Sequence, residues 1–111
     1  MPLPDPHLLT AALAHLVVPG SDLQIAGPDG RCSRVRVKML ANDCLVGSMP
    51  AGRLAPGAIA IARVWANERV NLLSLAVEEV EATILDRMDV LLRLVGLDQL
   101  FQRWRLQHQE G

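Results

Sequence analysis

The clearest hydrophobic pattern in the chain is an alternation of apolar and basic residues that begins at residue 34. Val35, Val37 and Met39 alternate with Arg34, Arg36 and Lys38. A period of two places apolar side chains on one face of a strand and cations on the other. Asn42-Asp43 then tolerates a left-handed backbone, so the chain can reverse into a second apolar run, Cys44 to Met49. The pattern predicts a half-buried β-hairpin.

Similar patterns predict a helix and three further strands around this hairpin. Asp5-Pro6 resembles a helix N-cap followed by proline at the first helical position, and the apolar spacing behind it predicts a helix over residues 6–18. Turn residues rich in Pro and Gly separate the strand candidates, which are 22–26, 32–40, 44–49, 58–65 and 69–75. Five short strands at this spacing predict a small, strongly bent sheet or barrel, with its core within residues 22–83.

The apolar period changes after residue 76. Val77, Val80, Ile84, Met88, Leu91 and Val95 follow steps close to those of a helix, and Gly96 is a typical helix end. Asp98 can cap a second short helix with the apolar stripe Leu97, Leu100, Phe101 and Trp104. We therefore expect a C-terminal helical extension over residues 84–108. The sequence leaves two assignments for residues 77–83: the start of this helix or a fifth barrel strand.

Length and composition fit one mainly β domain (α+β) with flanking helices. The chain has 111 residues, of which 50% are hydrophobic and 3% aromatic, so its core must be aliphatic. No apolar run reaches the roughly 20 residues that cross a bilayer, and the N-terminus lacks the basic start of a secretory signal. We expect a cytoplasmic protein without a membrane partner, in which Cys32 and Cys44 are reduced thiols.

The charges are segregated along the chain although the net charge is only −1. Residues 31–76 carry seven cations and two acids, whereas the segments on both sides are acidic. A row of cations on one strand face suits sequence-independent contacts with nucleic-acid phosphates. The nucleic-acid candidates are Arg34, Arg36 and Lys38, with Arg63 and Arg69 as weaker ones on neighbouring strands. The alternative is an edge strand that charge protects against aggregation.

Enzymatic chemistry finds no support in the sequence. The serines lack a surrounding motif, no glycine-rich phosphate loop lies between a strand and a helix, and the three histidines lie far from both cysteines. Gly27-Pro28-Asp29-Gly30 is better explained as a hairpin turn, because Pro lacks an amide hydrogen and Asp repels phosphate. We expect no catalytic residue, no cofactor and no metal.

The hairpin run V-R-V-K-M-L-A-N-D-C-L-V-G, residues 35–47, resembles the first two strands of the Sm-like family, which includes bacterial Hfq. The resemblance extends over residues 34–83, since a helix precedes the strands and Leu73 to Val77 is similar to the last turn and fifth strand of Hfq-like chains. It implies an SH3-like barrel, a ring made by pairing the fourth strand of one subunit with the fifth of the next, and RNA as ligand. The family's uridine-binding Lys-His pair has no counterpart here.

These observations predict an Sm-like homo-oligomer that binds single-stranded RNA through its basic strand face. The resemblance implies that this oligomer is a ring. The alternative function is a non-enzymatic assembly module that docks a partner on the C-terminal stripe of Leu97, Leu100, Phe101 and Trp104.

Overall fold

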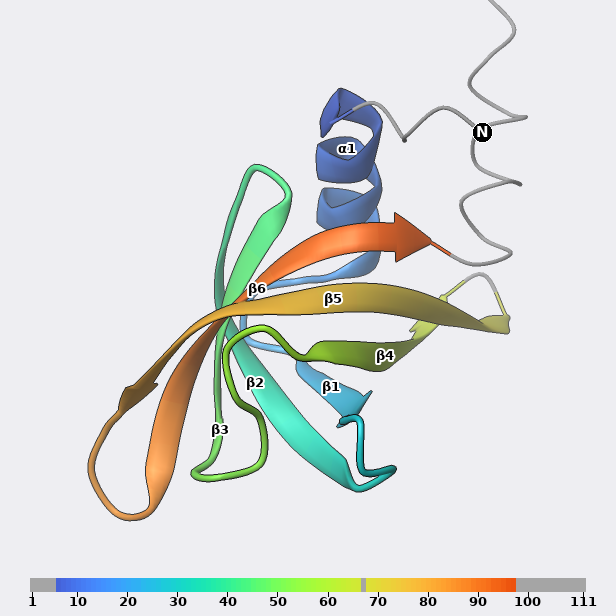
Figure 1. The fold of residues 1–111 in the computed structure, drawn as a ribbon. Coiled ribbons are helices and arrows are strands. Elements are labelled where there is room, and N and C mark those ends of the chain that lie inside the picture. The colour runs from blue at the N-terminus through green and yellow to red at the C-terminus, as the bar shows by residue number, and fades with distance from the viewer. Residues whose placement is uncertain (1–5, 67, 98–111) are drawn as a thin grey trace, which may run out of the picture.

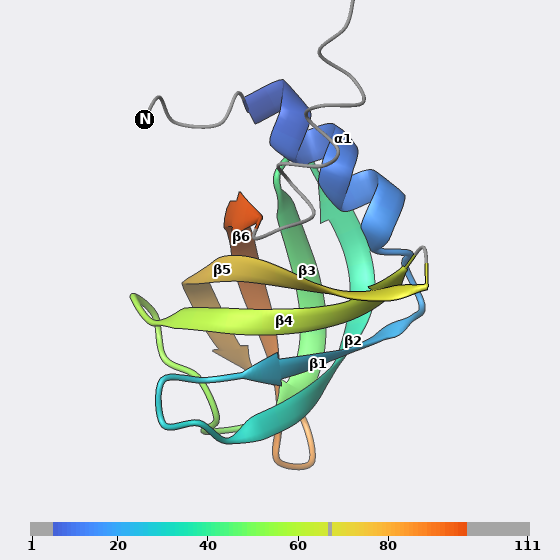
Figure 2. The same ribbon diagram turned by 90° about the vertical axis from the view of Figure 1, so that its right-hand side faces the viewer.

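Six antiparallel strands close into a barrel, and one short helix lies at its upper end (Figures 1 and 2). The structure is a computed structural model that describes residues 6–66 and 68–97. Its elements are α1 (Pro6–Leu16), β1 (Asp22–Ala26), β2 (Cys32–Ala41), β3 (Cys44–Pro50), β4 (Ile59–Ala66), β5 (Arg69–Ala82) and β6 (Arg87–Leu97). The strand order around the barrel is β1-β2-β3-β6-β5-β4, and pairing of β1 with β4 closes it.

The barrel interior is aliphatic, as the composition predicts. Alternate residues of each strand point inward, and Leu45, Leu73 and Leu92 from three different strands are fully buried. Leu13, Leu16 and Val17, from α1 and the residue after it, join the same core. Burial of these side chains supplies the main driving force for folding.

Gly47 allows β2 and β3 to approach closely at the centre of the predicted hairpin. Gly47 lies opposite Val37 on β2 and opposite Val90 on β6. A Cβ atom at this position would overlap Val35 Cγ1 and lie 3.2 Å from the Arg36 carbonyl oxygen. The position therefore requires a residue without a side chain.

The β2–β3 hairpin forms as predicted, with one difference beyond Lys38. Asn42 has a φ of 56° in the tight turn, in agreement with the left-handed backbone expected there. A bulge between Val37 and Met39 shifts the register, so Met39 is 53% exposed and Leu40 packs against the core instead. The prediction that Met39 is buried is wrong because alternation continues only as far as the bulge.

The prediction of a helix over residues 84–108 is wrong for its described part, and of the two alternatives for residues 77–83 the structure confirms the strand. Residues 77–82 continue β5, and Arg87–Leu97 form β6, which gives the barrel six strands rather than five. Met88, Val90, Leu92 and Leu94 alternate inward with a period of two, but the outward Leu91 and Val95 are also apolar and half-buried, which hides this period. The rest of the predicted extension, residues 98–108, lies outside the described residues. At the N-terminus, α1 ends at Leu16 instead of residue 18.

Candidate anion-binding groove

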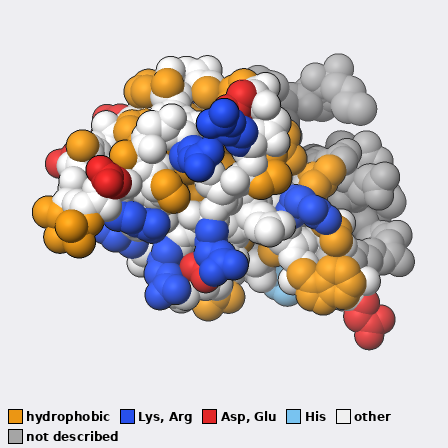
Figure 3. All heavy atoms as spheres, turned by 90° about the horizontal axis from the view of Figure 1, so that it is seen from below, with side chains coloured by type: hydrophobic (Ala, Val, Ile, Leu, Met, Phe, Trp, Pro, Cys, Tyr) orange, Lys and Arg blue, Asp and Glu red, His pale blue; other side chains and the backbone are white. Residues whose placement is uncertain are grey.

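The basic face of β2 forms as the alternation predicts. Arg34, Arg36 and Lys38 are exposed on the outside of the barrel, whereas Val35 and Val37 between them are buried. Seen from the end opposite α1, Lys and Arg side chains gather over this side of the molecule (Figure 3). The strand therefore presents its cations to solvent.

These cations line an open groove of about 500 Å³ that lies between β2 and the neighbouring β3–β6 pair. β2 and β3 pair as far as Arg36 and Ser48, and their pairing ends there. On its other side β3 pairs with β6 along its whole length, and Pro50 lies opposite Arg87. The lining residues are Asp22 from β1, Arg34, Arg36 and Lys38 from β2, Ser48 and Pro50 from β3, and Arg87 from β6.

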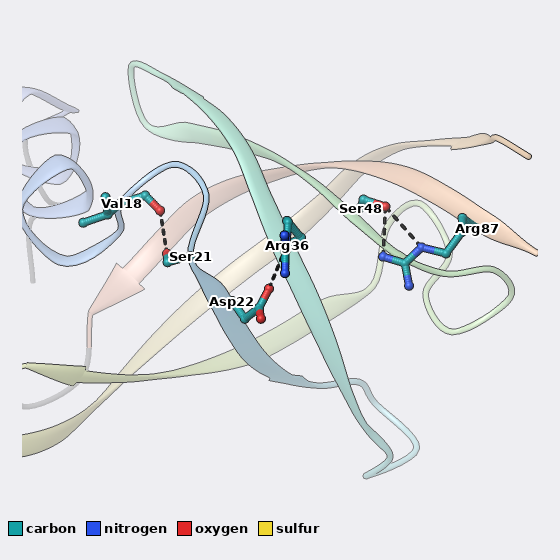
Figure 4. A network of polar contacts seen from close by, with 6 residues as sticks. All are labelled: Val18, Ser21, Asp22, Arg36, Ser48 and Arg87. Carbon is teal, nitrogen blue, oxygen red and sulfur yellow. Dashed lines mark hydrogen bonds and ion pairs between the residues drawn. The ribbon is translucent and has the colours of Figure 1, made fainter.

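Two of the four cations that line the groove have acidic partners. Arg36 Nε lies 3.1 Å from Asp22 Oδ1, and Figure 4 shows the two side chains pointing toward each other. The Lys38 ammonium lies 2.9 Å from Asp89 Oδ1 and 3.0 Å from Oδ2, and it donates its hydrogen bond to Oδ2. Asp89 Oδ1 is buried and accepts no hydrogen bond from the described part of the chain. Partly exposed pairs of this kind contribute less than about 1 kcal/mol each to stability, so an incoming anion can compete for these cations.

The other two cations, Arg34 and Arg87, have no acidic partner among the described residues. Arg87 donates from Nε and Nη2 to Ser48 Oγ, at 3.3 and 3.0 Å (Figure 4), and this hydroxyl fixes the guanidinium without neutralising it. The Arg34 side chain makes no hydrogen bond or ion pair within residues 6–66 and 68–97. The groove lining therefore has four cations and one acid, and a net charge of +3. Planar guanidinium groups of this kind suit bidentate contacts with phosphate oxygens.

The two weaker candidates, Arg63 and Arg69, do not line the groove. Arg63 is exposed on β4, opposite Gln24 of β1, which in turn lies opposite Arg34 of β2. It therefore belongs to the same outer face, two strands away. Arg69 begins β5 opposite Ala66, and only its backbone is described.

Arg87 and Ser48 are site residues that the sequence did not indicate. They lie 39 positions apart and meet only because β3 and β6 pair. Alternation of Met88, Val90, Leu92 and Leu94 was the signal that could have placed Arg87 on a strand. Of the predicted partner stripe, Leu97 ends β6 opposite Leu73. Leu100, Phe101 and Trp104 lie outside the described residues.

The two cysteines lie outside the groove lining. Cys32 and Cys44 are free thiols, exposed and half-buried respectively. Burial raises the pKa of Cys44, and a hydrogen bond from its Sγ to Asp43 Oδ1 at 3.5 Å favours the neutral thiol further. Across residues 6–66 and 68–97, His, Cys, Asp and Glu side chains form no cluster of three that could hold a metal ion. Among the same residues, no helix is long and apolar enough to span a membrane.

Fold and groove together define a small, closed antiparallel β-barrel with a cationic groove on its outer face. Comparison of the chain with protein-family models, curated proteins and solved structures found no match. The Sm-like relationship consequently stays a prediction from residues 34–83. The barrel closes within one chain, so each of its six strands already pairs with two neighbouring strands.

Proposed function

We propose that the protein binds single-stranded RNA by contacts between the groove and the phosphodiester backbone. The observation that carries the proposal is the pair of arginines without acidic partners, Arg34 and Arg87, which line one groove from two different strands. Phosphate contacts of this kind are independent of sequence, and they provide most of the affinity in non-specific nucleic-acid binding.

Charge protection of a strand edge is the competing explanation for the cations of β2. It requires only charges along β2, and it gives no reason for Arg87 of β6 to lie in the same groove. It also gives no reason for Ser48 to hold the Arg87 guanidinium with two hydrogen bonds. Convergence of cations from non-neighbouring strands on one groove favours a bound anion.

The proposal is tested by titrating a fluorescently labelled twelve-nucleotide oligouridylate against the wild-type chain, R34A, R87A and the control R93A. Arg93 lies on β6 but pairs with Glu78 outside the groove. We expect R34A and R87A each to weaken binding severalfold and R93A to change it little. Wild-type binding that is absent, or that R93A weakens as much as R34A does, would overturn the proposal. Shorter oligouridylates, down to one nucleotide, show whether the groove alone is filled or a longer strand is followed.

A second candidate function, assembly with further copies of the chain, is favoured by exposed apolar side chains on the outer face of β4. Ile59 and Ile61 point outward there, and Val70 on β5 adds to the same face. Because β4 and β5 are already paired within one chain, such an assembly would use side-chain contacts rather than added strands. Light scattering of the wild-type chain and of an I59E/I61E variant tests it: we expect an oligomer that the variant dissociates, and a wild-type monomer would refute it.

A further inference from the structure

Trp65 is the largest apolar side chain left exposed on the described surface, and it is 71% exposed. It lies near the end of β4, two residues after Arg63, and both side chains point away from the core. Among the described residues the indole stays largely open to solvent beside its cross-strand neighbour Val70, and it offers a flat apolar face that a ligand can use.

Strand register places Trp65 beside the groove. β1 and β4 pair in antiparallel register from Ala26 and Ile61 to Gln24 and Arg63, where their pairing ends, and Trp65 lies two residues beyond Arg63 on β4. Asp22 lies opposite Arg36 of β2 and lines the groove. In Figure 2 the end of β4 and the start of β1 lie on the same side of the barrel. Within the paired region Arg63 is two strands from Arg34 of β2, a separation of about 10 Å, and Trp65 follows two residues further along β4.

We infer that Trp65 is a stacking platform for a nucleobase whose backbone phosphate lies in the groove. This inference rests on the proposed function and specifies its ligand further. A base attached to a phosphate at Arg36 must reach across β1, whose exposed side chains at this level are Asp22 and Gln24. Arg63 lies two residues before Trp65 on the same exposed face of β4 and can contact the following phosphate.

Stacking on Trp65 selects a single strand over a duplex. A paired base presents only its edges, because its two faces are covered by neighbouring base pairs, whereas an unpaired base can rotate its face onto the indole. Such stacking tolerates every base. The site therefore recognises flexible single strands with little preference for sequence.

The test uses a W104F background, which leaves Trp65 as the only tryptophan of the chain. The probes are a twelve-nucleotide oligouridylate, an abasic oligomer of the same length and charge, and inorganic polyphosphate. We expect the oligouridylate to quench Trp65 fluorescence and the two base-free probes to leave it unchanged. In the same background, W65A should bind oligouridylate at least about fivefold more weakly, with its salt dependence unchanged. I84A, which removes another exposed apolar side chain from the β5–β6 turn outside the groove lining, is the matched control and should bind normally.

Failure of this inference can be separated from failure of the proposed function. Equal affinities of W65A and its parent for oligouridylate, or equal affinities of the parent for oligouridylate and the abasic oligomer, would overturn stacking while phosphate binding stands. If no probe binds, or if R34A and R87A bind like the wild type, the groove itself is not the site. Low accessibility of Trp65 to acrylamide in the free protein would also overturn the inference, because another part of the chain or a second copy would then cover the indole.

Discussion

Replacement of Asp22 by Asn should increase the affinity for RNA, although it removes an ion pair from the protein. Asp22 is the one acid that lines the groove, and its Oδ1 lies 3.1 Å from Arg36 Nε. A phosphate bound at Arg36 would lie about 6 Å from this carboxylate, where repulsion between unit charges in water is about 0.7 kcal/mol. Removal of the charge also frees Arg36 for the phosphate. We expect affinity to rise about threefold at low salt, with a smaller effect at higher salt because of screening.

Asp29→Asn is the matched control for this experiment. Asp29 is also an exposed acid that pairs with an arginine, Arg31, at 3.7 Å, but it lies in the β1–β2 turn outside the groove. Each variant should lose less than about 1 kcal/mol of stability, since both pairs are exposed. Fluorescence anisotropy with labelled oligouridylate at two salt concentrations provides the comparison. A D22N variant that binds no tighter than D29N would refute phosphate binding at Arg36, because the groove would then not be where phosphate binds.

The remaining predictions concern stability and thiol chemistry. G47A should destabilise the fold by about 1–3 kcal/mol, because its Cβ would overlap Val35, and an unchanged urea midpoint would contradict this. L85N/D86G should stabilise the fold by about 1 kcal/mol, because both residues have positive φ in the β5–β6 turn, at 59° and 57°. A lower urea midpoint would contradict this and would show that the exposed Leu85 side chain stabilises the fold. Cys44 should react with iodoacetamide more slowly than Cys32 at pH 8, since burial raises its pKa and lowers its thiolate fraction, and peptide mass spectrometry that found Cys44 to be the faster would refute this. The same shift means that the folded state keeps the Cys44 proton to higher pH than the unfolded state, so this group's contribution to stability is lost as pH rises above the unfolded thiol's pKa.

Local patterns in the sequence predicted those elements whose two faces differ in polarity. β2 has cations on one face and valines on the other, and a tight turn at Asn42 follows it, so both the hairpin and its exposed cations could be read from the sequence. β6 was harder to recognise, because the outward Leu91 and Val95 interrupt the polar face formed by Arg87, Asp89 and Arg93, and the resulting apolar spacing also fits a helix. In β5, a bulge between Val77 and Glu79 also shifts the alternation of inward and outward side chains.

The groove was only half predictable for a related reason. Arg34, Arg36 and Lys38 come from one strand and share a visible pattern. Arg87 and Ser48 join them through pairing of β3 with β6, a long-range contact that no local period reports. The acids that modulate the groove, Asp22 and Asp89, likewise reach it from other strands.

The central claim is that the groove binds RNA phosphates, and the salt dependence of binding tests it most directly. For single strands, the logarithm of the binding constant falls with the logarithm of salt concentration by about 0.7 for each phosphate neutralised. We predict that the wild-type chain binds the twelve-nucleotide oligouridylate with a clear negative slope, and that R34A/R87A lowers its magnitude by about 1.4. An unchanged slope in this double variant, or wild-type binding that does not respond to salt, would contradict the account.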